Sequence, residues 1–320
     1  MANFVAYDYA IPISSKAIAE PQSLDYLRKA YVVCISNAVS PLGVTVIEDI
    51  TDPTDIAGYT DDKGIDSLFD AGMTSINMIT LDPSGSIVDA KTEIEALLNK
   101  TLTILIHSSV GGTPQETLDT CSISKNIVIA KIYPSASLAD AEILVSKGCA
   151  FIDDSTDLKS MYFYFGLLLS YPTFINHQYA ALTPATGSLT VADVGTAENY
   201  FNKRLSFAID GDGKSPRELG FFVCGGATMT DRYIDEEVAR KIQEKGKEFI
   251  AIGAPFKTDE NLKDMTLTLR TVFVPYESSG QLLAGQSTLN ITDKGVDFMA
   301  AGTIAMKKAQ ALWRTAFELI

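Results

Sequence analysis

Few residues of this 320-residue chain have types and spacings that could do chemistry. Residues 208–215 (Ala-Ile-Asp-Gly-Asp-Gly-Lys-Ser) fit a loose phosphate-binding loop with alanine in place of the first glycine. Such a loop points backbone N–H groups and a lysine at a phosphate just before a helix begins. Here two aspartates would repel phosphate, and Pro216 and an apolar strand follow. The pattern therefore predicts a hairpin turn, which Asp-Gly pairs favour.

The two histidines are His107 and His177. His107 ends an apolar strand and leads into a turn with glycines at 111–112, and α/β enzymes often bind ligands at such strand ends. One hypothesis is therefore an α/β enzyme with a site at strand ends near His107 and Asp153 or Asp154. The region contains neither a GxSxG elbow nor a GxGxxG fingerprint. A structural histidine is the favoured interpretation, and His177 has no partner that we can name.

Adjacent carboxylates at 61–62 and 153–154 could bind a metal or move protons, but neighbouring strand residues point to opposite faces. We expect them to cap helices. Residues 235–237 (Asp-Glu-Glu) are expected in the first turn of a helix, where the dipole favours acids. A calcium-binding EF-hand loop starting at Asp210 is excluded. Such a loop needs glycine at its sixth position and glutamate at its twelfth, and these positions hold Ser215 and Phe221. The sequence thus predicts no catalytic, cofactor-binding or metal-binding residue.

Composition excludes several functional classes. The chain has 26 Lys and Arg against 40 Asp and Glu, a net charge of -14, which disfavours binding to nucleic acid or to anionic lipid. A hydrophobic content of 46% is too high for a disordered chain. The four cysteines are too scattered for a disulfide framework or a CxxC metal site. We expect no signal peptide and no membrane helix, since the longest strongly apolar stretch, 161–171, is about half the length that a span needs.

Apolar runs and helical patterns alternate over residues 30–152, which is typical of βαβ units around a buried sheet. We predict an α/β fold with a mainly parallel or mixed sheet covered by helices and with extended terminal arms. Gly72 and Gly148 are expected to end two of the helices. The predicted strands are 30–35, 44–47, 75–81, 102–107, 127–132 and 149–152, a helix-start signal lies at 52–55, and the predicted helices are 63–71, 89–98 and 137–147.

The predicted organisation has three parts: an N-terminal arm at 1–22, a first core part at 23–175 and a second core part at 176–320. A loop rich in Pro, Thr and Ala at 171–189 suggests the boundary. The elements predicted after residue 152 are a buried helix at 158–169, helices at 191–203 and 231–249, a hairpin of strands 205–209 and 219–223, a long strand at 265–276 and a C-terminal helix at 293–319.

The order of these features resembles the contractile-tail sheath proteins of myophages, particularly the short families. Three stretches carry the resemblance. The first is 49–56 (Asp-Ile-Thr-Asp-Pro-Thr-Asp-Ile) with the helix 65–72 and the strand 76–79. The second is 167–172 (Leu-Leu-Leu-Ser-Tyr-Pro) with Ala-Leu-Thr at 181–183 and Leu-Thr at 189–190, and the third is 225–235 (Gly-Gly-Ala-Thr-Met-Thr-Asp-Arg-Tyr-Ile-Asp).

The resemblance implies a structural subunit without an active site, which assembles as a helical array around a tail tube and contracts by rigid-body subunit rotation. Neighbouring copies would be linked by arms that add strands to one another's sheets, and residues 1–16 suit such an arm. The implied partners are other copies of the chain, the tube protein, and baseplate and tail terminator proteins, without nucleic acid, membrane or cofactor. The implied location is the virion of a bacteriophage, after synthesis in the host cytoplasm.

The C-terminus departs from the sheath pattern, because the chain ends in a predicted helix with Trp313 and Phe317 instead of an extended strand. If a C-terminal arm exists, residues 265–276 could supply its strand. Two alternatives stay open: the enzyme with a site near His107 and Asp153, and another phage or cell-surface assembly protein unrelated to sheaths.

Overall fold

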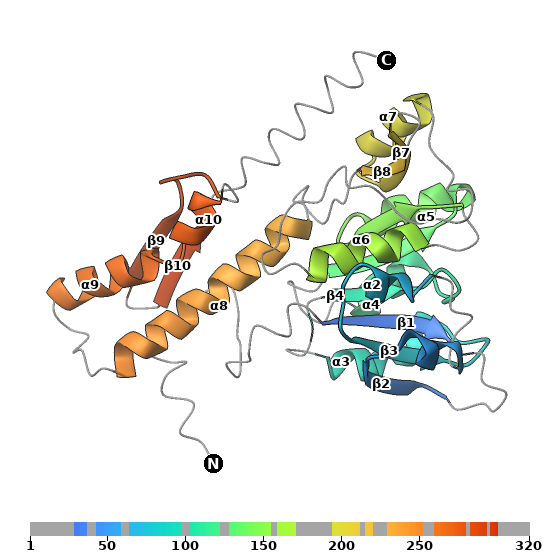
Figure 1. The fold of residues 1–320 in the computed structure, drawn as a ribbon, viewed down its shortest axis with the longest axis horizontal. Coiled ribbons are helices and arrows are strands. Elements are labelled where there is room, and N and C mark those ends of the chain that lie inside the picture. Colours follow the sequence, from blue (N-terminus) through green and yellow to red (C-terminus); the bar gives the residue numbers. More distant parts are fainter. Residues whose placement is uncertain are drawn as a thin grey trace. The chain divides into compact units, whose positions relative to one another are not determined.

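The computed structural model describes residues 29–36, 43–58, 64–97, 101, 103–121, 128–154, 159–170, 194–211, 215–219, 229–251, 259–279, 282–292 and 295–299. These residues fall into two compact units that divide between Arg232 and Tyr233 (Figure 1). We call them the sheet unit and the C-terminal unit and describe each by itself. The predicted arm 1–22 and the predicted boundary near residue 175 lie outside the described residues, so the three-part division stays a prediction.

The sheet unit is built on an eight-stranded sheet in the order β2-β3-β1-β4-β5-β6-β7-β8. The inner strands, from β3 to β7, run parallel, whereas the outer strands β2 and β8 pair antiparallel with their neighbours. The predicted mixed α/β sheet is therefore confirmed. The strands are β1 (Ala30–Ile35), β2 (Thr45–Ile50), β3 (Ile76–Leu81), β4 (Thr103–Ile106), β5 (Val128–Tyr133), β6 (Cys149–Ile152), β7 (Ser206–Gly211) and β8 (Ser215–Leu219).

Burial explains why the inner strands read as continuous apolar runs in the sequence. Every residue of β3, β4, β5 and β6 is buried, so both faces of these strands are covered. The outer strand β2 instead alternates between half-buried and exposed residues. Its pairing with β3 is interrupted by an irregularity between Ile47 and Ile50, where Asp49 has a φ of 56°.

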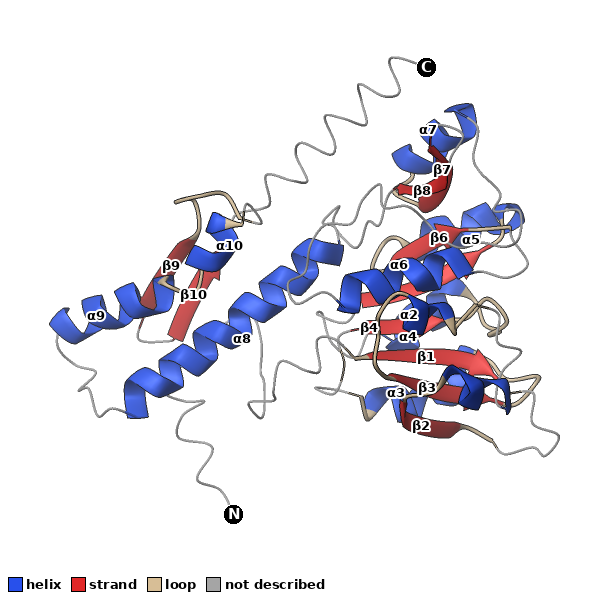
Figure 2. Cartoon of the chain, viewed as in Figure 1, coloured by secondary structure: helices blue, strands red, loops and turns tan. Residues whose placement is uncertain are grey.

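The helices of the sheet unit form two groups whose members pack on one another (Figures 1 and 2). In one, α2 (Ser67–Asp70) packs on α6 (Lys159–Ser170), and the approach is close: a Cβ at Gly166 would lie 2.5 Å from the Cβ of Ala71. In the other, α4 (Pro114–Cys121) packs on α5 (Leu138–Leu144) and on the short helix η3 (Ile87–Ala90). The remaining elements are η2 (Pro53–Gly58), α3 (Lys91–Glu95), η4 (Ser135–Ser137) and α7 (Val194–Asn202).

Helix α4 is absent from our sequence prediction, although the sequence carries its start signal. The backbone N–H of Thr113 donates to the Glu116 carboxylate at 2.7 Å, and the N–H of Glu116 donates to the Thr113 hydroxyl at 3.2 Å. These two bonds form a capping box, and Pro114 occupies the first helical position. The predicted role of Gly72 in ending α2 is confirmed, since its φ is +104°.

The C-terminal unit contains α8 (Met229–Ala251), α9 (Asp259–Arg270), α10 (Val274–Ser278) and the antiparallel pair β9 (Thr288–Thr292) and β10 (Gly295–Met299). The predicted long strand at 265–276 is wrong, because this stretch is helical. Its Met-Thr-Leu-Thr-Leu run alternates like a strand, but Met265 and Leu269 are the buried residues, and they are four apart as on one helix face.

Two further predictions are corrected here. The predicted helix at 293–319 is wrong where it can be compared, because residues 295–299 form β10; the rest lies outside the described residues. Residues 235–237 are not in the first turn of a helix, since α8 begins at Met229. Glu236 and Glu237 instead pair along the helix with Arg240 and Lys241. The hairpin predicted around Asp210 is confirmed, with its second strand at Ser215–Leu219 instead of 219–223.

Candidate functional site

The structure places His107 and Asp153 at the carboxyl edge of the parallel sheet, as predicted. The N–H of His107 donates to the Val33 carbonyl at 2.9 Å, and the N–H of Asp153 donates to the Tyr133 carbonyl at 3.1 Å. Each residue therefore extends the ladder one step beyond β4 or β6. Because β5 lies between those strands, their axes are about 10 Å apart. The two side chains are thus not neighbours on adjacent strands.

The surroundings of His107 fit a structural role better than that of a general base. Its ring Nδ1 accepts the Ser109 N–H at 3.1 Å and lies 2.6 Å from the Ser109 hydroxyl oxygen. An accepting Nδ1 places the ring proton of the neutral imidazole on Nε2. The ring stacks on Tyr162 of α6 at a centroid distance of 6.2 Å, and both side chains are fully buried. His107 therefore holds the turn after β4 in place through its hydrogen bond with Ser109 while its ring packs against Tyr162.

The glycine pair 111–112 closes this edge. Gly111 forms a parallel bridge with Ser86, and its carbonyl accepts the Ile87 N–H at 3.0 Å. Gly112 has a φ of +109°, and a Cβ there would lie 2.9 Å from Cγ2 of Ile87. The turn after β4 thus packs on the loop after β3. The glycines permit this close approach of the two turns at the carboxyl edge.

Lys131, which our sequence prediction did not single out, supports the same turn from below. It is buried in β5, and its ammonium group donates to the Val110 carbonyl at 2.9 Å. Burial lowers the pKa of Lys131, while burial raises the pKa of the nearby Cys121 thiol to about 12. A thiol held in its neutral form is a poor nucleophile. The available sequence signal was a lysine inside the apolar run 127–132.

One member of the predicted carboxylate pairs, Asp154, makes a contact at the start of a helix. Asp154 accepts the Ser135 N–H at 2.7 Å, at the start of η4. It therefore caps the helix that follows the neighbouring strand. Residues 61–62 and His177 lie outside the described residues. No group of three metal-ligating side chains occurs within the described ranges. Asp210 lies in β7 opposite Pro216, and the segment after the turn is the strand β8 instead of a helix, which excludes the phosphate-loop interpretation.

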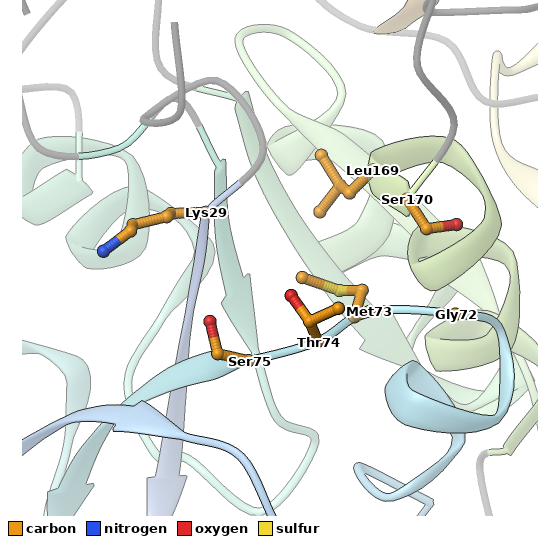
Figure 3. A pocket seen from close by; sticks show the side chains of 7 residues that line it. All are labelled: Lys29, Gly72, Met73, Thr74, Ser75, Leu169 and Ser170. Carbon is orange, nitrogen blue, oxygen red and sulfur yellow. The ribbon is translucent and has the colours of Figure 1, made fainter. Parts of the chain in front are cut away.

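A pocket of about 290 Å³ lies at the other edge of the sheet, shown in Figure 3. Lys29 directly precedes β1 and Ser75 directly precedes β3, so the pocket is at the amino ends of these strands. Ligands of open α/β sheets bind at the carboxyl ends. Its polar groups already serve the fold: Ser170 donates to the Ala71 carbonyl at 3.0 Å, and Lys29 pairs with Asp49 at 3.2 Å. The lining is completed by Gly72, Met73, Thr74 and Leu169.

Comparisons with known proteins show the fold of this chain but no sequence family. The sequence matches no family model and no curated protein. In contrast, solved structures with the same fold cover most of the chain. A chain of the anti-feeding prophage baseplate superposes with a TM-score of 0.62 at 9% sequence identity, covering 90% of this chain and 94% of that one. A chain of the anti-feeding prophage helical sheath in the contracted state gives a TM-score of 0.60 at 11% identity, covering 90% and 95%.

A sheath tail protein from Desulfitobacterium hafniense has a TM-score of 0.51 at 9% identity, covering 90% of this chain and 96% of that chain. The predicted resemblance to contractile sheath proteins is therefore confirmed at the level of the fold. Across the described part of the chain, no helix is both long and apolar enough to span a membrane.

Proposed function

We propose that this chain is a structural, non-enzymatic subunit of a contractile sheath, which assembles as a helical array around a tail tube and contracts by rigid-body rotation of its subunits. The observation that carries the proposal is the fold likeness itself. It extends over 90% of this chain and 95% of a chain from a helical sheath in its contracted state.

The sheet unit suits rigid-body motion. Its inner strands are buried on both faces, and the turns at its carboxyl edge are fixed to one another through Ser86, Gly111 and Lys131. Packed cores of this kind resist continuous deformation, so a change of state takes place at their interfaces. A rigid sheet unit would allow the subunit to keep its fold while the sheath contracts.

The strand pair β9–β10 suits the exchange of arms between copies. Among the described residues these strands pair only with each other, and β9 packs on α9. A two-stranded sheet is stabilised by a helix packed on it, as α9 packs on β9, and a third strand would stabilise it further. We propose that an arm from another copy, drawn from residues 1–22, adds to this pair through backbone hydrogen bonds. The core would then comprise the predicted parts 23–175 and 176–320.

The outer strands of the large sheet are poorer acceptors for such an arm. Strand β2 carries the irregularity at Asp49 and exposes Glu48 and Asp49. Strand β8 contains Pro216, which has no N–H to donate, followed by Arg217 and Glu218. Bulges, charges and prolines are devices by which edge strands avoid pairing with other chains. The contrast favours β9–β10 as the site of strand addition.

The proposed partners are other copies of this chain, a tail tube protein, and baseplate and terminator proteins, with no nucleic acid, membrane, metal or cofactor. The proposed location is the virion of a phage tail, after synthesis in the host cytoplasm. The net charge of -14 could meet a complementary tube through exposed ion pairs. Each such pair is worth about 0–1 kcal/mol and is screened by salt, which suits a surface that slides.

Electron microscopy of the purified chain, alone and coexpressed with its tail tube protein, tests the proposal. We expect hollow helical tubes or stacked rings. If the chain remains monomeric at high concentration and no helical layer of its native particle contains it, the proposal fails.

A further inference from the structure

An exposed stripe runs along α9 and α10 of the C-terminal unit. We define the α9–α10 stripe as Leu267, Arg270, Thr271 and Val274, which are all exposed. Leu267 is 65% exposed and Val274 is 54% exposed, whereas the intervening Leu269, Val272 and Phe273 are buried. Leu267 and Arg270 lie three residues apart on one side of α9, Thr271 lies in the turn after this helix, and Val274 begins α10. The apolar residues of this segment therefore divide into a core face and an outward face.

The chemistry of the stripe is that of an interface anchor. Arg270 is the only charged residue from Met265 to Tyr276 in a chain with net charge -14. In the sequence it lies between Leu267 and Val274, whose apolar side chains are exposed to water in the isolated subunit. Arginine amid apolar side chains is typical of the centre of protein interfaces. An anionic surface with its own exposed apolar side chain would complement this pattern.

The sheet unit offers such a surface. We define the acidic edge as Val46, Glu48, Asp49 and Asp52, which are all exposed and lie on β2 and the turn that follows. Val46 is 41% exposed, and residues two apart on a strand share a face about 7 Å apart. Leu267 and Arg270, one turn apart on a helix, have a spacing of about 5–6 Å. Leu267 can therefore meet Val46 while Arg270 meets Glu48.

We propose that the α9–α10 stripe of one copy docks on the acidic edge of a second copy of this chain. The inference rests on the proposed function, because it concerns the same array. The two surfaces differ, so the contact is heterologous: each copy presents one surface to each of two neighbours. Heterologous contacts close into rings or continue as helices, which are the forms that a sheath requires. The proposed strand addition at β9–β10 and this contact would be separate links between copies.

Charge reversal tests the contact. Arg270→Glu places an anion against the acidic edge, and we expect the concentration needed for assembly to rise about tenfold or more. Lys245→Glu makes the same charge change at an exposed residue of α8 and serves as the matched control, with an expected change below about twofold. The double variant Arg270→Glu with Glu48→Arg should recover assembly. Equal assembly of Arg270→Glu and wild-type protein would overturn the inference.

Cross-linking provides a second test that does not depend on Glu48, whose carboxylate also accepts a hydrogen bond from Tyr31. Leu267→Cys and Val46→Cys are made on separate chains that carry Cys224→Ser, mixed, assembled and oxidised. Cysteines at a true contact can approach to the roughly 4 Å between Cβ atoms that a disulfide needs. We expect a disulfide-linked dimer in assembled samples only, and much less with Ile143→Cys in place of Val46→Cys.

The outcomes separate this inference from the proposed function. Assembly of wild-type protein with no Val46–Leu267 cross-link refutes the docking contact and leaves the sheath proposal intact. A cross-link between Leu267→Cys and a cysteine on the tube protein would assign the stripe to the tube and would also overturn it. Absence of any wild-type assembly, including with the tube protein present, refutes the sheath proposal first.

Discussion

The two sheets of this protein differ in how far each completes itself. Strands β3, β4, β5 and β6 of the eight-stranded sheet are buried on both faces, the outer strands carry an irregularity, charges and a proline, and the turns at the carboxyl edge bind one another. The pair β9–β10 packs on α9 through β9, and among the described strands the two pair with each other alone. The difference suggests that the eight-stranded sheet supplies the stability of the chain, whereas β9–β10 is completed by a strand from a partner.

Removing the proposed partner strand gives the largest expected effect. Deletion of residues 1–22 should abolish assembly, because the proposed acceptor strands lose their third strand, and leave the sheet unit folded. Electron microscopy tests the loss of assembly, and circular dichroism tests whether the sheet unit stays folded. A deletion variant that assembles as well as the full chain would show that β9–β10 does not need this arm.

Replacing His107 tests the closed edge. His107→Ala should lower the free energy of unfolding by about 2–4 kcal/mol, because it leaves a cavity beneath Tyr162 and removes the acceptor of the Ser109 N–H. Urea unfolding measures the loss. Ser109→Ala removes only the hydroxyl contact and should cost about 1 kcal/mol. A His107→Ala protein of unchanged stability would contradict the bracing role and revive the enzyme hypothesis.

Weakening the start of α4 gives a smaller effect at the same edge. Thr113→Ala should lower the free energy of unfolding by about 1 kcal/mol, since it removes the hydroxyl of the capping box. The control is Gln115→Ala, two residues along the same helix and hydrogen-bonded only to Asp119 in an exposed pair, which should change stability by about 0.5 kcal/mol or less. Equal effects of both changes would show that the box contributes nothing.

The smallest expected effect is at Lys131 and appears chiefly as pH dependence. Burial lowers the folded-state pKa of this ammonium below 10.5, so folding disfavours the charged form, and the native state gains stability as pH rises from that lowered value towards 10.5. Lys131→Met removes the cost of burying the ammonium group but also removes the donor to the Val110 carbonyl, so the net change at pH 7 should stay within about 1 kcal/mol. The stability of the variant relative to the wild-type protein should fall as pH rises, and unfolding curves at several pH values test this. A pH-independent difference would contradict the prediction.

Much of the large sheet could be predicted because its strands are buried and apolar along their length. The predicted strands 30–35, 127–132 and 149–152 agree with β1, β5 and β6 to within a residue. Helix α4 was missed although Thr-Pro-Gln-Glu at 113–116 is a start signal, because its residues are too polar for a clear apolar period. The 265–276 stretch was misread because threonines alternate with apolar residues, while tertiary packing selects Met265 and Leu269.

The candidate site was predictable in position but not in character. Strand ends at His107 and Asp153 follow from the pattern of apolar runs. The stacking of Tyr162 on His107 joins residues 55 apart in the sequence (162 minus 107), and the bridge from Ser86 to Gly111 joins two turns. Such contacts depend on the complete sheet and decide whether a strand end is open to a ligand. Lys131 was visible in the sequence, but its partner, the Val110 carbonyl, was not.

Hydrogen–deuterium exchange on the free and the assembled chain tests the central contrast most directly. We expect amides of β9 and β10 to exchange readily in the free chain and to become at least about tenfold more protected on assembly. Amides of β1, β4 and β5 should be equally protected in both states. Assembled tubes in which β9 and β10 gain no protection, or in which β8 gains it instead, would contradict strand addition at β9–β10.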